Sequence, residues 1–171
     1  MREEWRAEQE SATRDAAEQW QHSRTLLDLA REHMHRGDRV AITVAGHRAV
    51  GEIIEVARDR IALLDNSAGA DSAGADGRRV DVHVTEAVPL AFSVVERARA
   101  GGRPGARSAT FRARLLELET AGAPVVVATS LGPDRFTGIV SVGTDLIVIA
   151  TPAGAETVIA LSSVAFVSPA V

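Results

Sequence analysis

The chain contains no cysteine, no lysine and no tyrosine. Because cysteine is missing, disulfides, thiolate metal ligands and cysteine nucleophiles are excluded. All 19 cationic side chains are arginine, which rules out a P-loop lysine, a Schiff-base lysine and a kinase-type lysine. The sequence therefore lacks residues on which several large enzyme classes depend.

Long apolar runs are also missing, since none approaches the roughly 18 residues that a membrane span requires. The segment MREEWRAEQE at the start is polar and acidic, whereas a signal peptide is basic and then apolar. We therefore expect a cytoplasmic protein. The formal net charge is −4, which gives no bulk attraction for nucleic acid or anionic lipid, and only residues 96–122 carry an excess of arginine.

The N-terminal part of the sequence has a strong helical pattern. Residues 2–35 are rich in Glu, Gln, Ala, Arg and Leu and contain no glycine or proline, which predicts one long helix that Gly37 ends. Apolar residues are sparse in its first part, where Trp5 and Trp20 stand out. We expect its last turns to dock on a core and its first part to project into solvent or meet a partner through Trp5 and Trp20.

Strand periodicity follows the helix. Apolar residues alternate from Val40 to Val44, and Gly51 inside the next strand suggests a sharp bend or a close backbone approach. The segment DNSAGADSAGADG is a flexible loop of small and polar residues. The predicted strands are 40–44, 50–56, 60–64, 80–84 and 92–95.

The second part of the chain repeats this pattern. Ser108 is the predicted N-cap of a helix over 109–121, and an Asp followed by an apolar strand occurs at Asp59 and again at Asp145. The register differs by one residue, because Gly51 precedes Asp59 by eight positions and Gly138 precedes Asp145 by seven. The predicted strands are 125–129, 136–142, 146–150, 157–161 and 164–167.

A short helix followed by five antiparallel strands resembles the Sm-like family, and the whole chain resembles a bacterial protein with a tandem Sm-like arrangement. The resemblance implies a mainly β fold of two small, bent, partly open five-stranded antiparallel barrels, each preceded by a helix. The predicted organisation is a helix over 1–36, a first barrel over 37–95, a basic Gly/Pro linker over 96–107, and a helix with a second barrel over 108–171. The family's second motif, an Arg-Gly pair or a Tyr-Lys-His run, is missing, because the corresponding stretches are TEAVPLAFS and ALSSVAF.

Open barrels leave unpaired backbone groups at their edges. In the Sm-like family these edges pair between subunits to form rings. The two copies in this chain could pair with each other or with other chains, and the alternative is a monomer whose helices cover the edges.

Arginines are the candidate RNA or phosphate contacts. Arg58 and Arg60 flank Asp59 in a turn that faces RNA in the Sm-like family, while the plainer interpretation is that Asp59 and Asp145 cap their own turns beside solvated arginines. The linker arginines are candidates to bind phosphates bidentately, or else belong to a mobile solvated connector. The linker set is Arg97, Arg99, Arg103 and Arg107.

Other site chemistry has little support. His33 and His35 point to different faces of a helix, so they do not converge on a metal, and no HxxxH or HExxH spacing occurs. Asp65, Asp71 and Asp76 do not have the spacing of a calcium loop. We predict a non-enzymatic assembly or protein-interaction module without cofactor, metal or small-molecule substrate, and RNA binding of the riboregulator type as the alternative.

Overall fold

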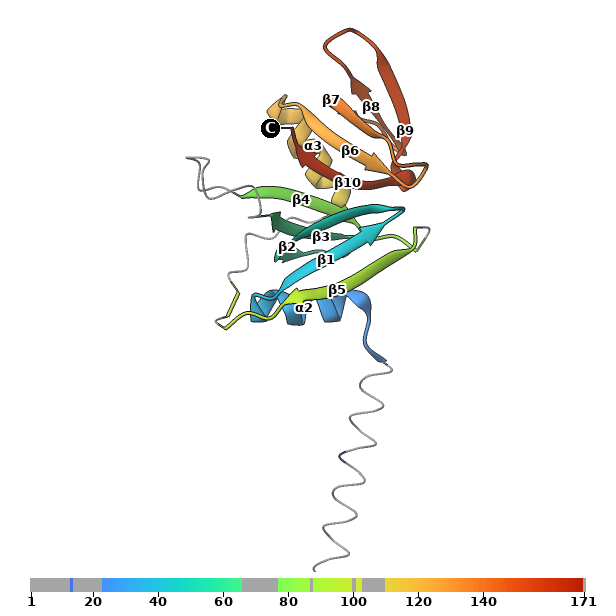
Figure 1. Ribbon diagram of the computed structural model, residues 1–171. Coiled ribbons are helices and arrows are strands. Elements are labelled where there is room, and N and C mark those ends of the chain that lie inside the picture. Colours follow the sequence, from blue (N-terminus) through green and yellow to red (C-terminus); the bar gives the residue numbers. More distant parts are fainter. Residues whose placement is uncertain are drawn as a thin grey trace, which may run out of the picture.

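The computed structural model of the chain describes residues 13, 23–65, 77–86, 88–99, 101–102 and 110–170 (Figure 1). These residues form helices, ten strands and one short 3-10 helix. In chain order the elements are α2 (Leu26–Arg36), β1 (Arg39–Val44), β2 (His47–Val56), β3 (Arg60–Asp65), β4 (Arg78–His83), β5 (Leu90–Glu96), α3 (Phe111–Ala121), β6 (Val125–Thr129), β7 (Arg135–Val142), β8 (Leu146–Ala150), β9 (Glu156–Ala160), η1 (Leu161–Ser163) and β10 (Val164–Pro169).

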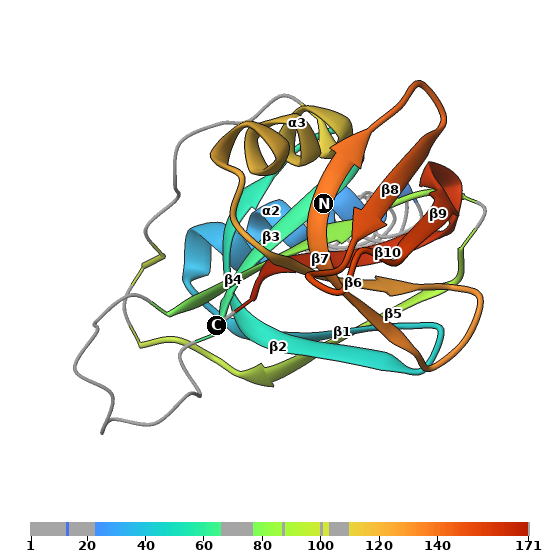
Figure 2. The same ribbon diagram turned by 90° about the horizontal axis from the view of Figure 1, so that it is seen from above.

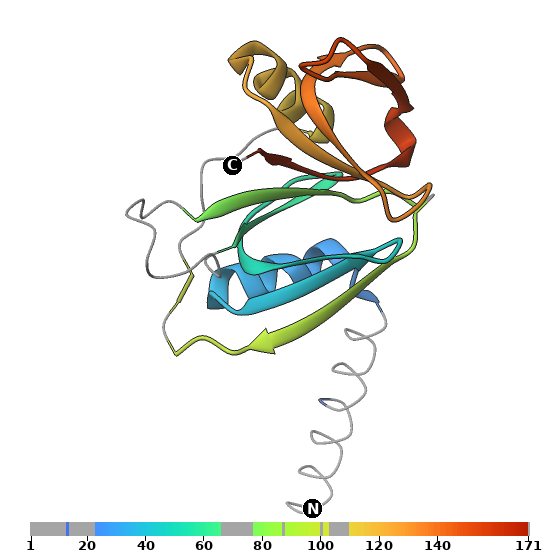
Figure 3. The same cartoon turned by 45° about the horizontal axis from the view of Figure 1, so that its top comes forward.

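The fold is mainly β, as predicted, but its strands form one open ten-stranded antiparallel sheet, and the two separate, partly open barrels of the prediction are not confirmed. The order across the sheet is β5-β1-β2-β3-β4-β10-β6-β7-β8-β9. Residues 26–99, called here the first half, and residues 110–170, the second half, are stacked one above the other (Figures 1 and 3). They join where β4 pairs with β10. The sequence left open whether the exposed edges pair with each other or with other chains. The structure contains the pairing between the two copies of one chain.

Each half has the same internal topology. The strand order is β5-β1-β2-β3-β4 in the first half and β10-β6-β7-β8-β9 in the second, so that each strand has an equivalent in the other half. The helices also correspond, because α2 packs on β2 and α3 packs on β7, and these strands hold the same place in the two orders. Seen from above, α3 and β9 lie on opposite sides of the second half (Figure 2). The repeat predicted from the sequence is thus present in the topology.

The turn before the third strand of each half confirms the alignment of Asp59 with Asp145. The backbone carbonyl of each aspartate accepts a hydrogen bond of 2.8 Å from the chain segment after the fourth strand. The same short turn bond precedes both strands. In donor-to-acceptor order the bonds are Val84 N to Asp59 O, Leu161 N to Asp145 O, Ala57 N to Arg60 O and Gly143 N to Leu146 O.

Gly51 and Gly138 mark the bend in each half. A Cβ atom at Gly51 would lie 2.5 Å from the carbonyl oxygen of Leu64, and one at Gly138 would lie 2.3 Å from that of Ala150. No side chain fits at these distances, so both strands need glycine where the neighbouring backbone approaches. The close approach predicted for Gly51 is confirmed, and Gly138 has the same role.

A β-bulge explains why the two copies differ by one residue between this glycine and the aspartate. The pairing of β2 with β3 shifts its register between Ile53 and Glu55, which leaves one extra residue in β2. The pairing of β7 with β8 runs without a shift. The difference is therefore a local insertion within a shared topology.

The first predicted helix is interrupted at residues 24–25, and the second begins at Phe111 rather than at 109. Thr25 is extended, with φ −87° and ψ 163°, and forms a capping box with Asp28, so a single helix over 2–35 is wrong at this point. The helix ends at Gly37 as predicted, in the left-handed conformation with φ 76°. Thr110 is the N-cap of α3 and accepts a bond from Ala113 N, while the predicted cap Ser108, like Trp5 and Trp20, lies outside the described residues.

Each half has its own hydrophobic core. The first core lies between α2 and strands β1 to β4 and also takes in Ala128, Ala165 and Phe166 from the second half. The second core is built from one face of α3, with Phe111, and from strands β6 to β10. No helix in the part of the chain that the structure describes is long and apolar enough to cross a membrane.

Candidate functional site

The side chains with the most distinctive environments gather where the two halves meet. The backbone pairing there is short, with Phe166 opposite Val82 and Val167 opposite Asp81. Side chains from β2, β3, β4, α3 and β10 add hydrogen bonds and ion pairs around it. We call this region, the β4–β10 pairing and its surrounding side chains, the junction.

Arg60 is the most unusual residue of the junction because its side chain is fully buried. Its guanidinium donates to the carboxylates of Glu55 and Asp81, both of which are also buried. Burying a charge is costly unless it is paired in this way. The prediction that Arg60 is a solvated side chain or an RNA contact is therefore wrong, since no ligand in solvent reaches it.

Asp81 is the centre of this buried cluster. Besides Arg60 it accepts hydrogen bonds from Arg79 Nη2 at 3.0 Å and from Arg114 Nε at 3.0 Å. Arg114 belongs to α3, so the cluster ties the helix of the second half to a strand of the first. Glu55 also accepts from Arg79, at 2.9 Å. Every carboxylate of the cluster is paired, which is the pattern of a structural ion network rather than of an acid–base catalyst.

Asp59 links the halves in a second place. Its Oδ1 accepts a hydrogen bond of 2.9 Å from the backbone N–H of Phe111, the first residue of α3. The carboxylate thus lies at the positive end of the helix. The interpretation that Asp59 caps its own turn is wrong, because its side chain bonds to the other half of the chain.

His83 completes the contact with α3. Its ring stacks on Phe111 with the centroids 4.3 Å apart and the planes 9° from parallel, and its Nδ1 lies 3.1 Å from the carbonyl oxygen of Val164. Burial lowers the pKa of His83 below 6.5, and this outweighs the effects of the Val164 carbonyl and Asp59, which raise it. The imidazole is therefore held in its neutral form as part of the packing between the halves.

The remaining predicted histidines do not converge. His33 Nδ1 lies 2.7 Å from Asp38 Oδ2, and the other oxygen of Asp38 accepts from Ala98 N at 2.8 Å. Burial would raise the pKa of Asp38, but these hydrogen bonds and the nearby charges lower it overall. His35 is exposed on α2. Within the described residues, no group of three or more His, Asp or Glu side chains is placed to hold a metal ion.

The predicted RNA-contact arginines are not brought together. Arg58 is exposed in the turn after β2, and Arg97 and Arg99 are exposed after β5. Glu52, six residues before Arg58, lies opposite Arg39, which also pairs with the last residue of β5. Arg58 therefore lies six residues beyond the level of Glu96 and follows a different strand of the sheet. Arg103 and Arg107 lie outside the described residues.

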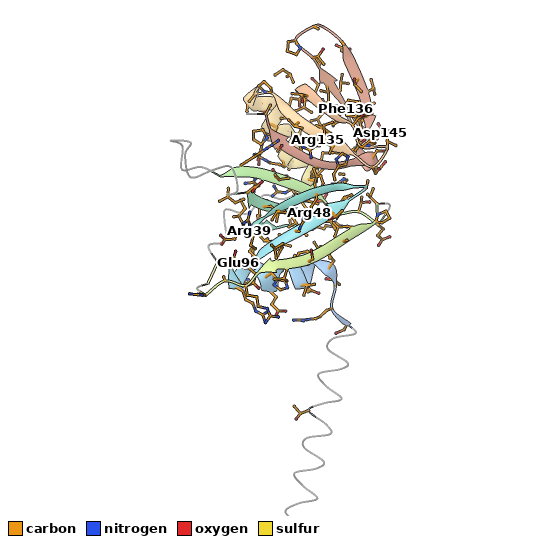
Figure 4. All side chains as sticks on the ribbon, viewed as in Figure 1. Arg39, Arg48, Glu96, Arg135, Phe136 and Asp145 are labelled. Atoms are coloured by element: carbon orange, nitrogen blue, oxygen red, sulfur yellow. The ribbon has the colours of Figure 1, made fainter. Side chains whose placement is uncertain are left out.

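Three other arginines do converge, and the sequence analysis did not select them. Arg48, Arg78 and Arg135 line one cavity of about 210 Å³ between the halves, together with Asp65 and Ser168. We call it the arginine cleft. Figure 4 labels Arg48 on the first half and Arg135 on the second. Its apolar lining consists of Ala49, Val50, Val80, Val126, Ala128 and Phe166.

Arg48 and Arg135 occupy equivalent positions in the two halves. Arg48 lies three residues before Gly51 at the start of β2, and Arg135 lies three residues before Gly138 at the start of β7. A repeated Arg-x-x-Gly pattern is therefore the sequence signal that could have identified them. Arg78 has no such signal, because its place depends on the pairing of β4 with β10.

No protein-family model, no curated protein and no solved structure matches this chain.

Proposed function

We propose that this protein is a non-enzymatic assembly module, made of two Sm-like units, that associates with further copies of itself through the outer edges of its sheet. The observation that carries the proposal is the junction. One chain already joins two equivalent five-stranded units through the outer strands β4 and β10. The same contact can be repeated between chains, because each chain still offers one edge of each kind.

Among the strands that the structure describes, β5 and β9 are the outermost, and each pairs on one side only. In the strand order of the halves, β5 is the equivalent of β10 and β9 is the equivalent of β4. A β9 edge facing the β5 edge of another copy would therefore reproduce the junction. Both edges expose apolar side chains, with Val158 on β9 exposed to 65% and Val95 on β5 to 49%. Exposed apolar residues on an unpaired edge favour pairing with another chain.

The junction also specifies the register. Val158 is the equivalent of Asp81, because each lies opposite the third residue of the preceding strand. Phe92 is the equivalent of Val167 by its pairing with β1. A repeated junction would place Val158 opposite Phe92. The contact between chains would thus have Val158 at the position that Asp81 holds in the junction within the chain.

Size-exclusion chromatography with light scattering tests the proposal over a range of protein concentrations. We expect a mass above that of the 18.1 kDa chain, and a shift toward the monomer in the variant Val158→Lys, since lysine on an edge strand opposes pairing. The matched control is Leu131→Lys, an equally drastic change at a residue that is 75% exposed in the β6–β7 loop. A monomer at all concentrations, or equal effects of the two variants, would contradict the proposal.

A variant that lacks residues 1–22 separates the edges from the N-terminal segment. If association is lost in this truncation and is unchanged in Val158→Lys, the partner surface is the segment with Trp5 and Trp20.

RNA binding stays a prediction and ranks below assembly, because Arg60 is buried and Arg58 follows a different strand from Arg97. Filter binding to single-stranded RNA at low salt checks this prediction.

A further inference from the structure

We propose that the arginine cleft binds a phosphate group, either free or carried by a small phosphomonoester. The cleft lies between the two halves and takes one arginine from β2, one from β4 and one from β7. The proposal does not depend on assembly, because none of its arginines lies on β5 or β9.

The walls of the cleft come from segments that other contacts hold in place. Arg78 on β4 donates from Nη2 to the hydroxyl of Ser168 on β10 at 2.7 Å. At the start of β2, His47 Nε2 lies 2.9 Å from the carbonyl oxygen of Gly132, and its ring meets Phe166 edge-on. The hairpins that carry Arg48 and Arg135 are thus fastened to each other directly beside the cleft, which limits the reorganisation that binding requires.

The charge of the cleft suits a dianion. Three arginines and Asp65 are among the residues that line it, and their formal charges leave an excess of two positive charges. Arg48 and Arg135 form no ion pair with any residue that the structure describes, and both are exposed to solvent. A phosphate monoester carries about −1.5 to −2 at neutral pH, whereas a lone carboxylate would compensate only half of the excess. Guanidinium groups also bind phosphate oxygens bidentately.

The size of the cleft limits the ligand. A volume of about 210 Å³ is below the roughly 300–1,000 Å³ of pockets for drug-sized molecules. The apolar side chains of Val50, Val126 and Phe166 can contact a short carbon skeleton attached to the phosphate. Inorganic phosphate and a small phosphomonoester share the anionic chemistry and differ only in that skeleton.

Isothermal titration calorimetry tests the proposal with three probes, namely inorganic phosphate, glycerol phosphate and a single-stranded oligonucleotide. We expect saturable binding of at least one of the first two, and a rise of the melting temperature with ligand concentration, because the ligand bridges the halves of the folded chain. Tighter binding of glycerol phosphate than of phosphate identifies a phosphomonoester as the ligand, and the reverse order identifies free phosphate.

The variants Arg48→Gln and Arg135→Gln test the site itself, and Arg58→Gln is the matched control, since Arg58 is also exposed but does not line the cleft. Loss of a charge-assisted hydrogen bond is expected to weaken binding about tenfold or more in each cleft variant, with no change in the control. Both arginines are exposed, so these variants are expected to fold.

Three results would overturn the proposal. The first is absence of binding to both small anions at low salt. The second is an equal affinity of the cleft variants and the Arg58→Gln control for the small anions. The third is oligonucleotide binding that strengthens with length and that phosphate does not compete with, because it would identify a nucleic-acid backbone as the ligand instead.

Discussion

Asp81→Asn is the substitution that most directly tests how the junction is held together. Asp81 is fully buried and accepts hydrogen bonds from Arg60, Arg79 and Arg114. Asparagine keeps the size of the side chain and removes its charge. Arg60, which is also fully buried, would then have Glu55 as its remaining carboxylate partner.

The expected loss of unfolding free energy in Asp81→Asn follows from the burial of this ion pair. Removing one partner of a buried ion pair costs about 3–5 kcal/mol, whereas an exposed pair is worth about 0–1 kcal/mol. At about 2–4 °C per kcal/mol for a chain of this size, we expect the melting temperature to fall by about 6–20 °C. The loss is larger than the polar contact alone suggests, because Arg60 stays behind in a site closed to water.

Urea unfolding followed by circular dichroism measures this free energy. Glu117→Gln is the control, since Glu117 pairs with Arg114 at 2.9 Å but is half-exposed, and we expect it to cost less than about 1 kcal/mol. If Asp81→Asn does not fold, Arg114→Gln tests the same cluster more mildly, because Arg60 and Arg79 still pair with Asp81. A cost for Asp81→Asn no greater than that for Glu117→Gln would refute the reasoning.

Two further predictions concern other parts of the halves. Gly51→Ala is expected to destabilise the fold by about 1–3 kcal/mol, because its Cβ would lie 2.5 Å from the Leu64 carbonyl oxygen. Gly132→Ala is the control, because a Cβ there meets no heavy atom within 4 Å and the backbone is not left-handed, and equal losses in thermal melts would disprove the clash. The lowered pKa of His83 means that the unfolded chain binds a proton first as the pH falls below 6.5. Stability is therefore fully present above about pH 6.5 and declines below it, and His83→Gln should flatten urea-measured stability between pH 7 and 5.5 relative to the unaltered protein.

The strands within each half were largely predictable, because their signals are local. Alternation from Val40 to Val44 depends only on neighbouring residues, and β8 occupies residues 146–150 as predicted. The one-residue difference between the copies could be seen in the sequence, but its cause, the bulge between Ile53 and Glu55, depends on which residue of β3 lies opposite. The sequence contains no direct information on that pairing.

The junction and the cleft were not predictable in the same way. Arg60 was interpreted as solvated because it follows a turn, but its burial depends on Asp81, which is 21 positions away and belongs to another strand. Arg78 lines the cleft only because β4 lies beside β10. The repeated Arg-x-x-Gly pattern at Arg48 and Arg135 was visible in the sequence, yet only the stacking of the halves places both arginines at one cavity.

The position of β10 in the sheet has a consequence for synthesis on the ribosome. β10 follows every other strand in the sequence, and its Val164 lies 81 residues after His83, to which it bonds. At about 5–20 residues per second, β4 stays without its neighbour for roughly 4–16 s after it emerges. During that interval β4 can accept the β10 strand of another nascent chain. Exchange of β10 between molecules is thus a misfolding route that this order of strands allows.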